Sequence, residues 1–227
     1  MKKLSVALFF IALAVQGFAQ EDESNIRFGL TLSPQVSWMT AGDGNIENNG
    51  AVFGFCYGLL MDVKIPKNYA FATGIIVSYD GGKLGWTDST KFNSFPDRLY
   101  PAGTNVEYHL QYVEIPLTLR LMTNQIGYIT YFGQFGLQAG FNFRSRADIT
   151  TPTGAEDESR VNFGSDVTPF NIGLLVGGGF EYEITGNTAL TVSLQYFNGF
   201  IDVTDDPKEY KVHSGLNHLR LGLGVFF

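Results

Sequence analysis

The feature that most constrains this chain is the strict alternation of short and long connections between eight segments with β periodicity. Large apolar side chains recur at every second position of each segment, which is the period of a strand. In the last segment, Leu216–Phe227, one face carries only large apolar groups and the other carries charge and glycine. A strand of a soluble sandwich would show the same pattern, so the connections must decide the fold.

The predicted strands are Ile26–Met39, Ala51–Ile65, Tyr69–Tyr79, Val106–Met122, Gly127–Phe143, Val167–Ile184, Thr188–Phe200 and Leu216–Phe227. Three connections are tight, namely Pro66–Asn68, Thr123–Ile126 and Thr185–Asn187. The four that alternate with them are long, namely Thr40–Gly50, Asp80–Asn105, Arg144–Asp166 and Ile201–Gly215. Outer-membrane barrels have short periplasmic turns and long extracellular loops, and closure removes the unpaired edges that hydrocarbon does not tolerate. We therefore predict an all-β, eight-stranded antiparallel up-and-down transmembrane barrel.

The first residues predict export. Two lysines precede the apolar run Leu4–Val15, and a small-x-small site follows it, which favours cleavage between Ala19 and Gln20. A retained transmembrane helix is the alternative, but the run is too short for one. The sequence thus predicts a signal peptide over residues 1–19 and an outer-membrane barrel domain over residues 20–227.

Composition supports a membrane location and excludes some partners. Charged residues make up 16% of the chain, below the roughly 25% typical of soluble domains. Loss of Lys2 and Lys3 lowers the 15 basic residues to 13, against 22 acidic ones, which argues against a nucleic-acid partner. The one cysteine, Cys56, cannot form an internal disulfide.

Charged side chains also fall on the inward parity of the strands. They are four acids and four bases: Arg27, Asp62, Lys64, Glu114, Arg120, Glu181, Glu183 and Arg220. An eight-stranded barrel is just wide enough for its own side chains, and unpaired buried charges are costly. The balance predicts a structural network of ion pairs that fills the lumen; a gated or narrow polar pore is the alternative. Many inward glycines would leave room for long side chains or water.

The second long loop is unusually apolar for an exposed segment. It contains Trp86, Phe92, Phe95 and Tyr100. Such patches often mark a binding surface, so this loop is the candidate extracellular binding site. The alternative is a loop that folds over the barrel mouth as a lid.

One motif carries a family resemblance. The run Tyr112–Leu121, YVEIPLTLRL, resembles a segment of the PorT-like outer-membrane barrel family of the Bacteroidetes group, most specifically at Glu114–Leu117. The resemblance implies an eight-stranded outer-membrane barrel and, in one branch, a part in protein secretion through the type IX machinery. Pro116 lacks an amide donor, which predicts a bulge or a missing ladder bond.

The histidines raise the alternative of a catalytic site. Lipid-modifying barrels use a histidine with a serine and a carboxylate, and His109 shares a face with Glu107, with Ser78 or Ser193 as conceivable partners. Nothing in the sequence fixes that geometry, and no metal-ligand spacing occurs. We therefore expect no enzyme, cofactor or metal.

The leading hypothesis is a non-enzymatic outer-membrane protein that acts in binding, assembly or surface interaction. A narrow porin-like channel is the second hypothesis, and a lipid-modifying enzyme is the third. The expected partners are outer-membrane lipid, the barrel-assembly machinery reading the terminal aromatic Phe227, and a protein on the extracellular or periplasmic side.

Overall fold

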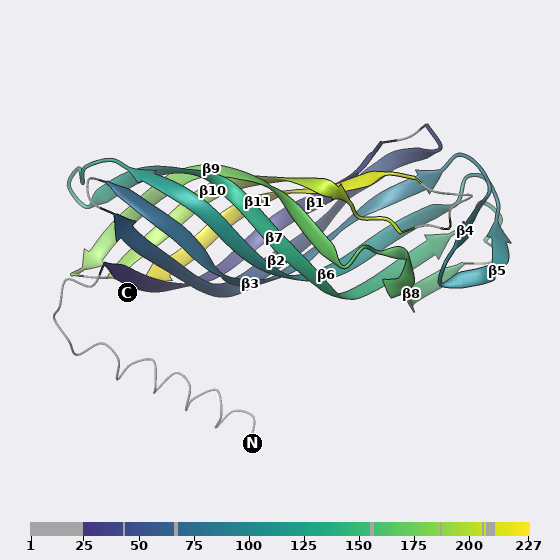
Figure 1. Cartoon of the computed structure of the whole chain (residues 1–227), viewed down its shortest axis with the longest axis horizontal. Coiled ribbons are helices and arrows are strands. Elements are labelled where there is room, and N and C mark those ends of the chain that lie inside the picture. Colours follow the sequence, from purple (N-terminus) through teal and green to yellow (C-terminus); the bar gives the residue numbers. More distant parts are fainter. Residues whose placement is uncertain are drawn as a thin grey trace, which may run out of the picture.

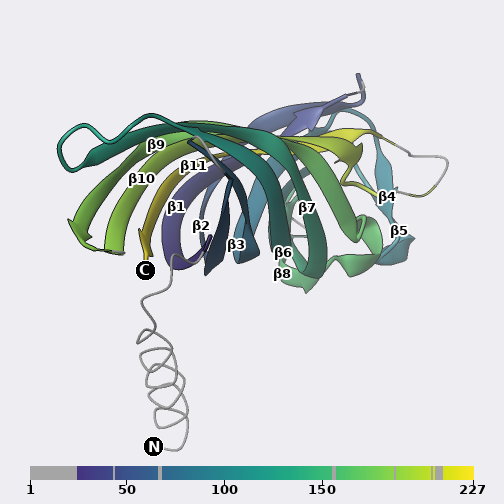
Figure 2. The same ribbon diagram turned by 60° about the vertical axis from the view of Figure 1, so that its left-hand side comes forward.

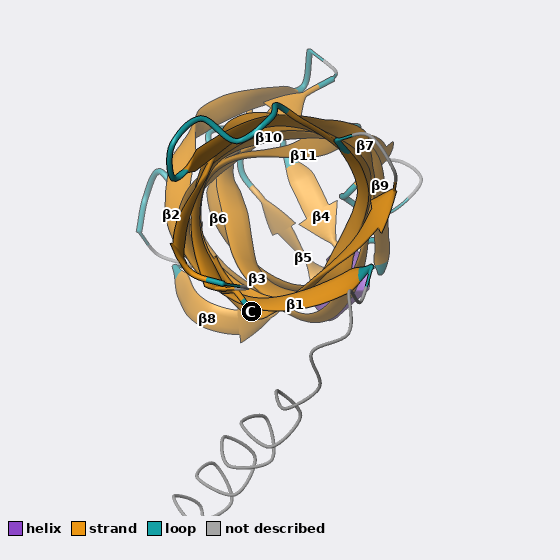
Figure 3. Cartoon of the chain, turned by 90° about the vertical axis from the view of Figure 1, so that its left-hand side faces the viewer, coloured by secondary structure: helices purple, strands orange, loops and turns teal. Residues whose placement is uncertain are grey.

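Eight long antiparallel strands form a closed barrel in the computed structural model (Figures 1 and 3). The structure describes residues 25–42, 44–65, 68–154, 157–186, 188–205, 207 and 212–227, so the predicted signal peptide and its cleavage site at Ala19 and Gln20 lie outside it. The barrel strands are β1 (Ile26–Ala41), β2 (Ile46–Ile65), β3 (Tyr69–Trp86), β6 (Asn105–Met122), β7 (Ile129–Thr150), β9 (Phe170–Thr185), β10 (Thr188–Asp202) and β11 (Ser214–Phe226). No helix among these residues is long and apolar enough to cross a membrane.

The topology confirms the predicted up-and-down barrel. Each barrel strand pairs with the barrel strands next to it in sequence, and β1 pairs with β11 to close the ring. In that closing pair Leu30 lies opposite Val225 and Trp38 lies opposite Asn217. The start of β1 and the C-terminus lie at the same end as the tight turns (Figure 1).

The end opposite the C-terminus is more structured than the sequence predicts. There β2 begins at Ile46, β3 continues to Trp86 and β7 continues to Thr150, so these strands extend into the predicted loops. The loops also hold the hairpin β4 (Thr90–Phe92) and β5 (Phe95–Tyr100), the strand β8 (Glu158–Asn162) and the short helix η1 (Gly164–Asp166). Figure 2 shows the hairpin and β8 at this end of the barrel.

The outer surface of the barrel confirms the predicted faces of the strands. Phe53, Leu59, Ile75, Leu137 and Leu194 are examples of the large apolar side chains that point outward and are exposed. Aromatic pairs mark both edges of this apolar band, as a membrane interface requires. They are Trp38–Tyr196, Phe55–Tyr79 and Phe141–Phe170 at the outer edge, and Tyr128–Tyr182 at the edge of the tight turns.

Inward glycines let the sheet bend tightly. A Cβ at Gly58 would lie 2.2 Å from the carbonyl oxygen of Ile75, and a Cβ at Gly136 would lie 2.2 Å from that of Leu117. These contacts involve the backbone of the neighbouring strand, so at these two positions the missing side chain serves strand curvature rather than space for long side chains.

The proline of the family-like motif interrupts the sheet as predicted. Between β3 and β6 the paired positions stop at Thr73–Leu117 and resume at Ile76–Glu114 with the register unchanged. Pro116 therefore leaves a gap in the ladder and adds no bulge, because it has no amide hydrogen to donate.

Candidate functional site

The lumen near the tight turns is closed by four charged side chains. Arg27 Nη2 donates to Asp62 Oδ2 at 2.8 Å and to Glu181 Oε1 at 2.6 Å. Arg120 Nη1 donates to the same two carboxylates, at 2.9 Å and 2.7 Å. The four residues come from four different strands, so the cluster spans the barrel. Two cations and two anions cancel, which removes most of the cost of burying them.

Two aromatic rings complete this inner plug. The Arg27 guanidinium lies 4.3 Å from the ring centroid of Phe226, and the Arg120 guanidinium lies 4.3 Å from that of Phe132. Both rings are buried. Cation–π contacts of this kind strengthen when they are shielded from water, and the rings fill the space beside the ions.

A second polar cluster lies nearer the extracellular end. Arg220 Nη2 donates to Glu114 Oε2 at 2.8 Å, and Arg220 Nε donates to Gln35 Oε1 at 2.8 Å. The Gln35 amide in turn donates to Asp80 Oδ1 at 2.7 Å. His218 Nδ1 lies 3.3 Å from the same oxygen of Asp80. All five residues are buried, so this outer cluster is a connected network across the lumen.

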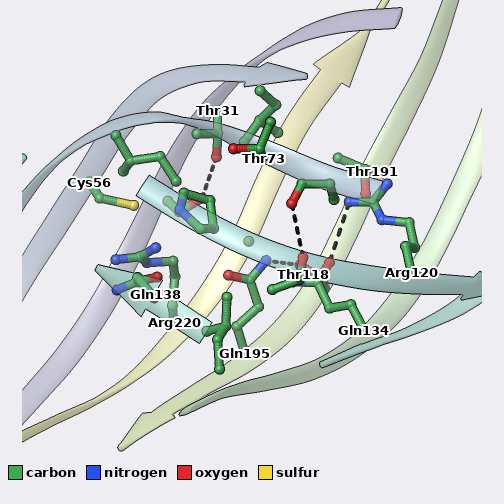
Figure 4. Close-up of a pocket in the computed structure, with 18 of the residues that line it drawn as sticks. Thr31, Cys56, Thr73, Thr118, Arg120, Gln134, Gln138, Thr191, Gln195 and Arg220 are labelled. Atoms are coloured by element: carbon green, nitrogen blue, oxygen red, sulfur yellow. Dashed lines mark hydrogen bonds between the residues drawn. The ribbon is translucent and has the colours of Figure 1, made fainter. Parts of the chain in front are cut away.

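A small polar cavity separates the two clusters. It has a volume of about 40 Å³, which is room for about three water molecules at roughly 10–15 Å³ each. Figure 4 shows Thr118, Gln138 and Gln195 around it, with Arg120 on one side and Arg220 on the other. The buried thiol of Cys56 also lines it. The middle of the lumen is therefore polar and less tightly packed than the two clusters on either side of it.

The predicted interior network is correct for six residues and wrong for two. Arg27, Asp62, Arg120 and Glu181 form the inner plug, and Glu114 and Arg220 belong to the outer cluster.

Lys64 is exposed and Glu183 is half-buried, and Glu183 accepts a hydrogen bond from Gln125 in the neighbouring turn. Both have the inward parity, but they lie at the rim of the barrel, where water solvates them.

Sequence reasoning missed several members of the outer cluster. Asp80 was assigned to a loop, because β3 was predicted to end at Tyr79, and the uncharged Gln35 and Ser78 were not counted as members of the interior network. Ser78 Oγ donates to Asp80 Oδ2, so it belongs to the same network. Ser78 already has the inward parity of the predicted strand, and extending the two-residue period of β3 by one step would have placed Asp80 inside the barrel as well.

The apolar loop forms a cap over the outer cluster. Trp86, Phe92, Tyr100 and Phe163 are each at most 2% exposed. The Phe92 ring centroid lies 5.2 Å from that of Trp86 and 5.1 Å from those of Tyr100 and Phe163. The view along the barrel in Figure 3 shows β4 and β5 across the far opening.

This packing corrects the prediction of an exposed aromatic surface. Trp86, Phe92 and Tyr100 point into the cap, and Phe95 is half-buried against it. The geometry is that of the alternative, a lid over the mouth, because folding the hairpin inward removes large apolar rings from water. Binding by this loop stays a prediction, and its exposed side chains would have to supply it.

A buried carboxylate ties the cap together. Asp166 of η1 accepts hydrogen bonds from the backbone N–H of Ser94 at 2.9 Å and from the Ser94 hydroxyl. The backbone N–H of Asn93 donates to the same carboxylate. The backbone carbonyl oxygen of Asp166 accepts a hydrogen bond from the N–H of Asp205 at 3.0 Å. Burial raises the pKa of Asp166 above the usual aspartate value, although these hydrogen bonds act in the opposite direction.

The histidine, serine and carboxylate of the catalytic alternative do not come together in the described part of the chain. His109 is half-buried on the outer surface, and its Nε2 lies 2.9 Å from Asp148 Oδ2. Ser78 and Ser193 are buried inside the barrel, so the wall separates both from His109. His109 and Glu107 do lie next to each other, with 3.8 Å between His109 Nε2 and Glu107 Oε1.

Three buried side chains have the chemistry of metal ligands. Asp80, Glu114 and His218 each offer a ligand atom, and these atoms lie within 4.8 Å of one another. However, Arg220 already donates to Glu114, and Gln35 already donates to Asp80. A divalent cation would have to displace or repel the arginine, so these residues fit a hydrogen-bonded network better than a metal centre.

The closed barrel, its outward apolar band and its aromatic edges define an integral outer-membrane β-barrel protein. The chain belongs to the family described as "Outer membrane protein beta-barrel domain", which matches residues 18–205. No curated protein matches the sequence.

Solved structures of three outer-membrane barrels are similar to this chain. Neisserial surface protein A is 14% identical, with 88% of this chain and 95% of that one covered and a TM-score of 0.47. AlkL is also 14% identical, with 92% and 93% covered and a TM-score of 0.47. The outer-membrane protease OmpT from Escherichia coli is 11% identical, with 89% and 95% covered and a TM-score of 0.40.

Proposed function

We propose that this outer-membrane protein is non-enzymatic, has a sealed lumen, and acts in binding, assembly or surface interaction through the outside of its extracellular cap. The observation that carries this proposal is the closure of the lumen at three levels. These are the inner plug, the outer cluster around Arg220 and the aromatic cap around Phe92. A protein whose interior is filled with its own side chains has only its outer surfaces for partners.

The energetics also support a closed resting state. Opening the inner plug would separate Arg120 from Asp62 and Glu181, all of which are buried. Breaking one partner out of a buried ion pair typically costs about 3–5 kcal/mol. An open state that far above the closed one would be populated in fewer than about one molecule in a hundred.

A narrow channel is the alternative proposal, and the polar cavity between the clusters is the observation that favours it. Purified protein in planar lipid bilayers tests both. The sealed lumen predicts no steady single-channel current. A steady current from the wild-type protein would overturn the proposal and establish the channel.

We further propose that the chain is a PorT-like member of its family, of the Bacteroidetes type. The support is the motif Glu114–Leu117, in which each distinctive residue has a structural role. Glu114 pairs with Arg220 in the outer cluster, and Pro116 interrupts the sheet ladder. Within that family, a part in type IX secretion would follow only if the chain belonged to the secretion branch.

The exposed face of the β5 strand is where we expect a protein partner. Leu99 is 54% exposed beside Arg98, on the side of the hairpin that faces away from the buried rings. Crosslinking in the native outer membrane, followed by mass spectrometry, tests this expectation. Leu99→Asp should abolish a stoichiometric partner while the exposed control Lys64→Gln retains it. Recovery of the wild-type protein only as a lone monomer would contradict an assembly role.

A further inference from the structure

The strand β7 changes its pairing partner at the outer edge of the membrane band. It pairs with β9 as far as Phe141–Phe170, and it pairs with β8 from Arg146–Asn162 onward. Between these points only two backbone hydrogen bonds are found among the described residues, from the Asn142 N–H to Pro169 and from the Phe163 N–H to Ser145, and a lateral notch of about 450 Å³ lies beside them. Phe143, Arg144 and Arg146 in its lining are exposed, and it shares no lining residue with the cavity between the two clusters. Its lining includes Asn142, Phe143, Arg144, Arg146, Asn162 and Pro169.

The depth of the notch is set by the aromatic residues beneath it. The rings of Phe141 and Phe170 lie 5.3 Å apart on the lipid-facing surface, and Phe143 is also exposed there. Aromatic side chains mark the membrane interface in barrels of this kind. Above them the outward positions of β7 become charged, beginning with Arg144. The notch therefore lies at the level of the lipid headgroups in the outer leaflet.

The charge of the notch is unusual for this chain. Arg144 and Arg146 are both exposed on its wall, opposite Gln111 and His109 of β6. Neither forms an ion pair with an acid within the described residues, whereas Arg98 pairs with Glu158 at 2.7 Å. The chain as a whole has a net charge of −7, so this pair of cations is a local exception.

We propose that the notch binds the phosphate group of a phosphorylated glycolipid of the lipid A type in the outer leaflet. Guanidinium groups form bidentate hydrogen bonds with phosphate, and two adjacent ones match its charge. The exposed rings of Phe143 and Phe141 offer an apolar track for an acyl chain below the phosphate. Two cations next to exposed aromatic rings fit an amphipathic lipid better than a soluble anion, because a soluble anion has no apolar part to contact the rings.

Native mass spectrometry of the purified protein with added lipid A tests this site. The double substitution Arg144→Gln and Arg146→Gln should weaken lipid A binding by about tenfold or more, since each charge-assisted hydrogen bond contributes roughly a tenfold factor. Arg98→Gln is the matched control, because it removes an exposed extracellular arginine whose partner is Glu158. It should leave binding unchanged.

Two further measurements use the wild-type protein, so they remain decisive if the double variant fails to fold. The affinity of the wild-type protein for dephosphorylated lipid A should be as low as the affinity of the double variant for lipid A. Inorganic phosphate should not displace lipid A from the wild-type protein. Equal binding of the phosphorylated and dephosphorylated lipids would overturn the proposal. So would equal binding by the wild-type protein and a folded double variant. Displacement by inorganic phosphate would assign the notch to a free anion and overturn the lipid assignment.

Discussion

The inner plug and the extracellular cap both close this barrel, but they use opposite chemistry. The plug is made of ions on the inward face of transmembrane strands, and the cap is made of aromatic rings contributed by loops. The wall around the plug must present apolar groups to lipid, so its polar groups are confined to the lumen and have to neutralise each other there. The cap lies beyond the apolar band and is stabilised as the core of a soluble protein is, by removal of large rings from water.

The largest difference between the two regions should appear on removal of an ion from the plug. Arg120→Ala leaves Asp62 and Glu181 with Arg27 as their one remaining cation, so we expect a loss of about 3–5 kcal/mol in the free energy of unfolding. Urea titration in detergent, followed by tryptophan fluorescence, measures it. Arg98→Ala, which breaks an exposed pair that solvent screens, should cost far less. Equal effects of the two variants would show that the plug is not a buried network.

Removal of a central ring should weaken the cap and leave the barrel intact. Phe92→Ala opens a void among Trp86, Tyr100 and Phe163 and should cost about 3 kcal/mol of local stability. Hydrogen exchange should then accelerate in β4, β5 and η1 and stay unchanged in β1 and β11. Uniform acceleration across all strands would show that cap and barrel form one cooperative unit.

The cap should also respond to pH through Asp166. Its pKa is raised in the folded protein, so the native state binds a proton more readily than the unfolded chain, and cap stability should fall as pH rises from the usual aspartate value of about 3.9 through the raised value. Proteolysis of the cap over a pH series measures this dependence. Asp166→Asn should abolish the slope, whereas an unchanged slope would assign the dependence to another group.

The smallest effect on stability is expected at Asp148 on the outer surface, where the dependence of stability on pH has the opposite direction to that at Asp166. Burial alone would raise the pKa of Asp148, but hydrogen bonds from the Arg160 N–H, His109 and Ser159 hold it below the usual value. Its stabilising contribution is therefore present above the usual aspartate value and is lost as pH falls through the lowered one. Asp148→Asn should change stability at neutral pH by less than about 1 kcal/mol, measured by the same urea titration, since the pair is partly exposed. A loss as large as that of Arg120→Ala would contradict this ranking.

The same contrast explains which parts of the structure the sequence could predict. Every second residue of a transmembrane strand faces lipid. The two-residue period of apolar side chains therefore identified the outward faces of the strands, the topology and most of the plug. The parity of a residue gives the face of the strand on which it lies but not its depth along the barrel. For that reason Lys64 and Glu183, which lie at the rim, were predicted to belong to the interior network. Beyond the membrane that signal stops, and Asp80 was assigned to a loop although β3 continues through it.

The cap could not be predicted, because its contacts join loops that are far apart in the sequence. Phe92 meets Phe163, and Ser94 meets Asp166, and no local pattern encodes either contact. The lateral notch likewise depends on a change of strand partner at β7, which appears only in the three-dimensional pairing. The terminal Phe227, whose N–H donates to the carbonyl oxygen of Phe28 at 2.9 Å, keeps its role in assembly as a prediction.

The most direct test of the sealed lumen uses Cys56, the single cysteine, which lines the cavity between the two clusters. If the lumen is sealed, a water-soluble maleimide should label Cys56 of the folded wild-type protein in proteoliposomes far more slowly than it labels a cysteine at an exposed control site. That control is Ser159→Cys in a Cys56→Ser background. Arg120→Ala should accelerate labelling of Cys56. Labelling of wild-type Cys56 as fast as the exposed control would show that solutes enter the lumen, and would contradict the account.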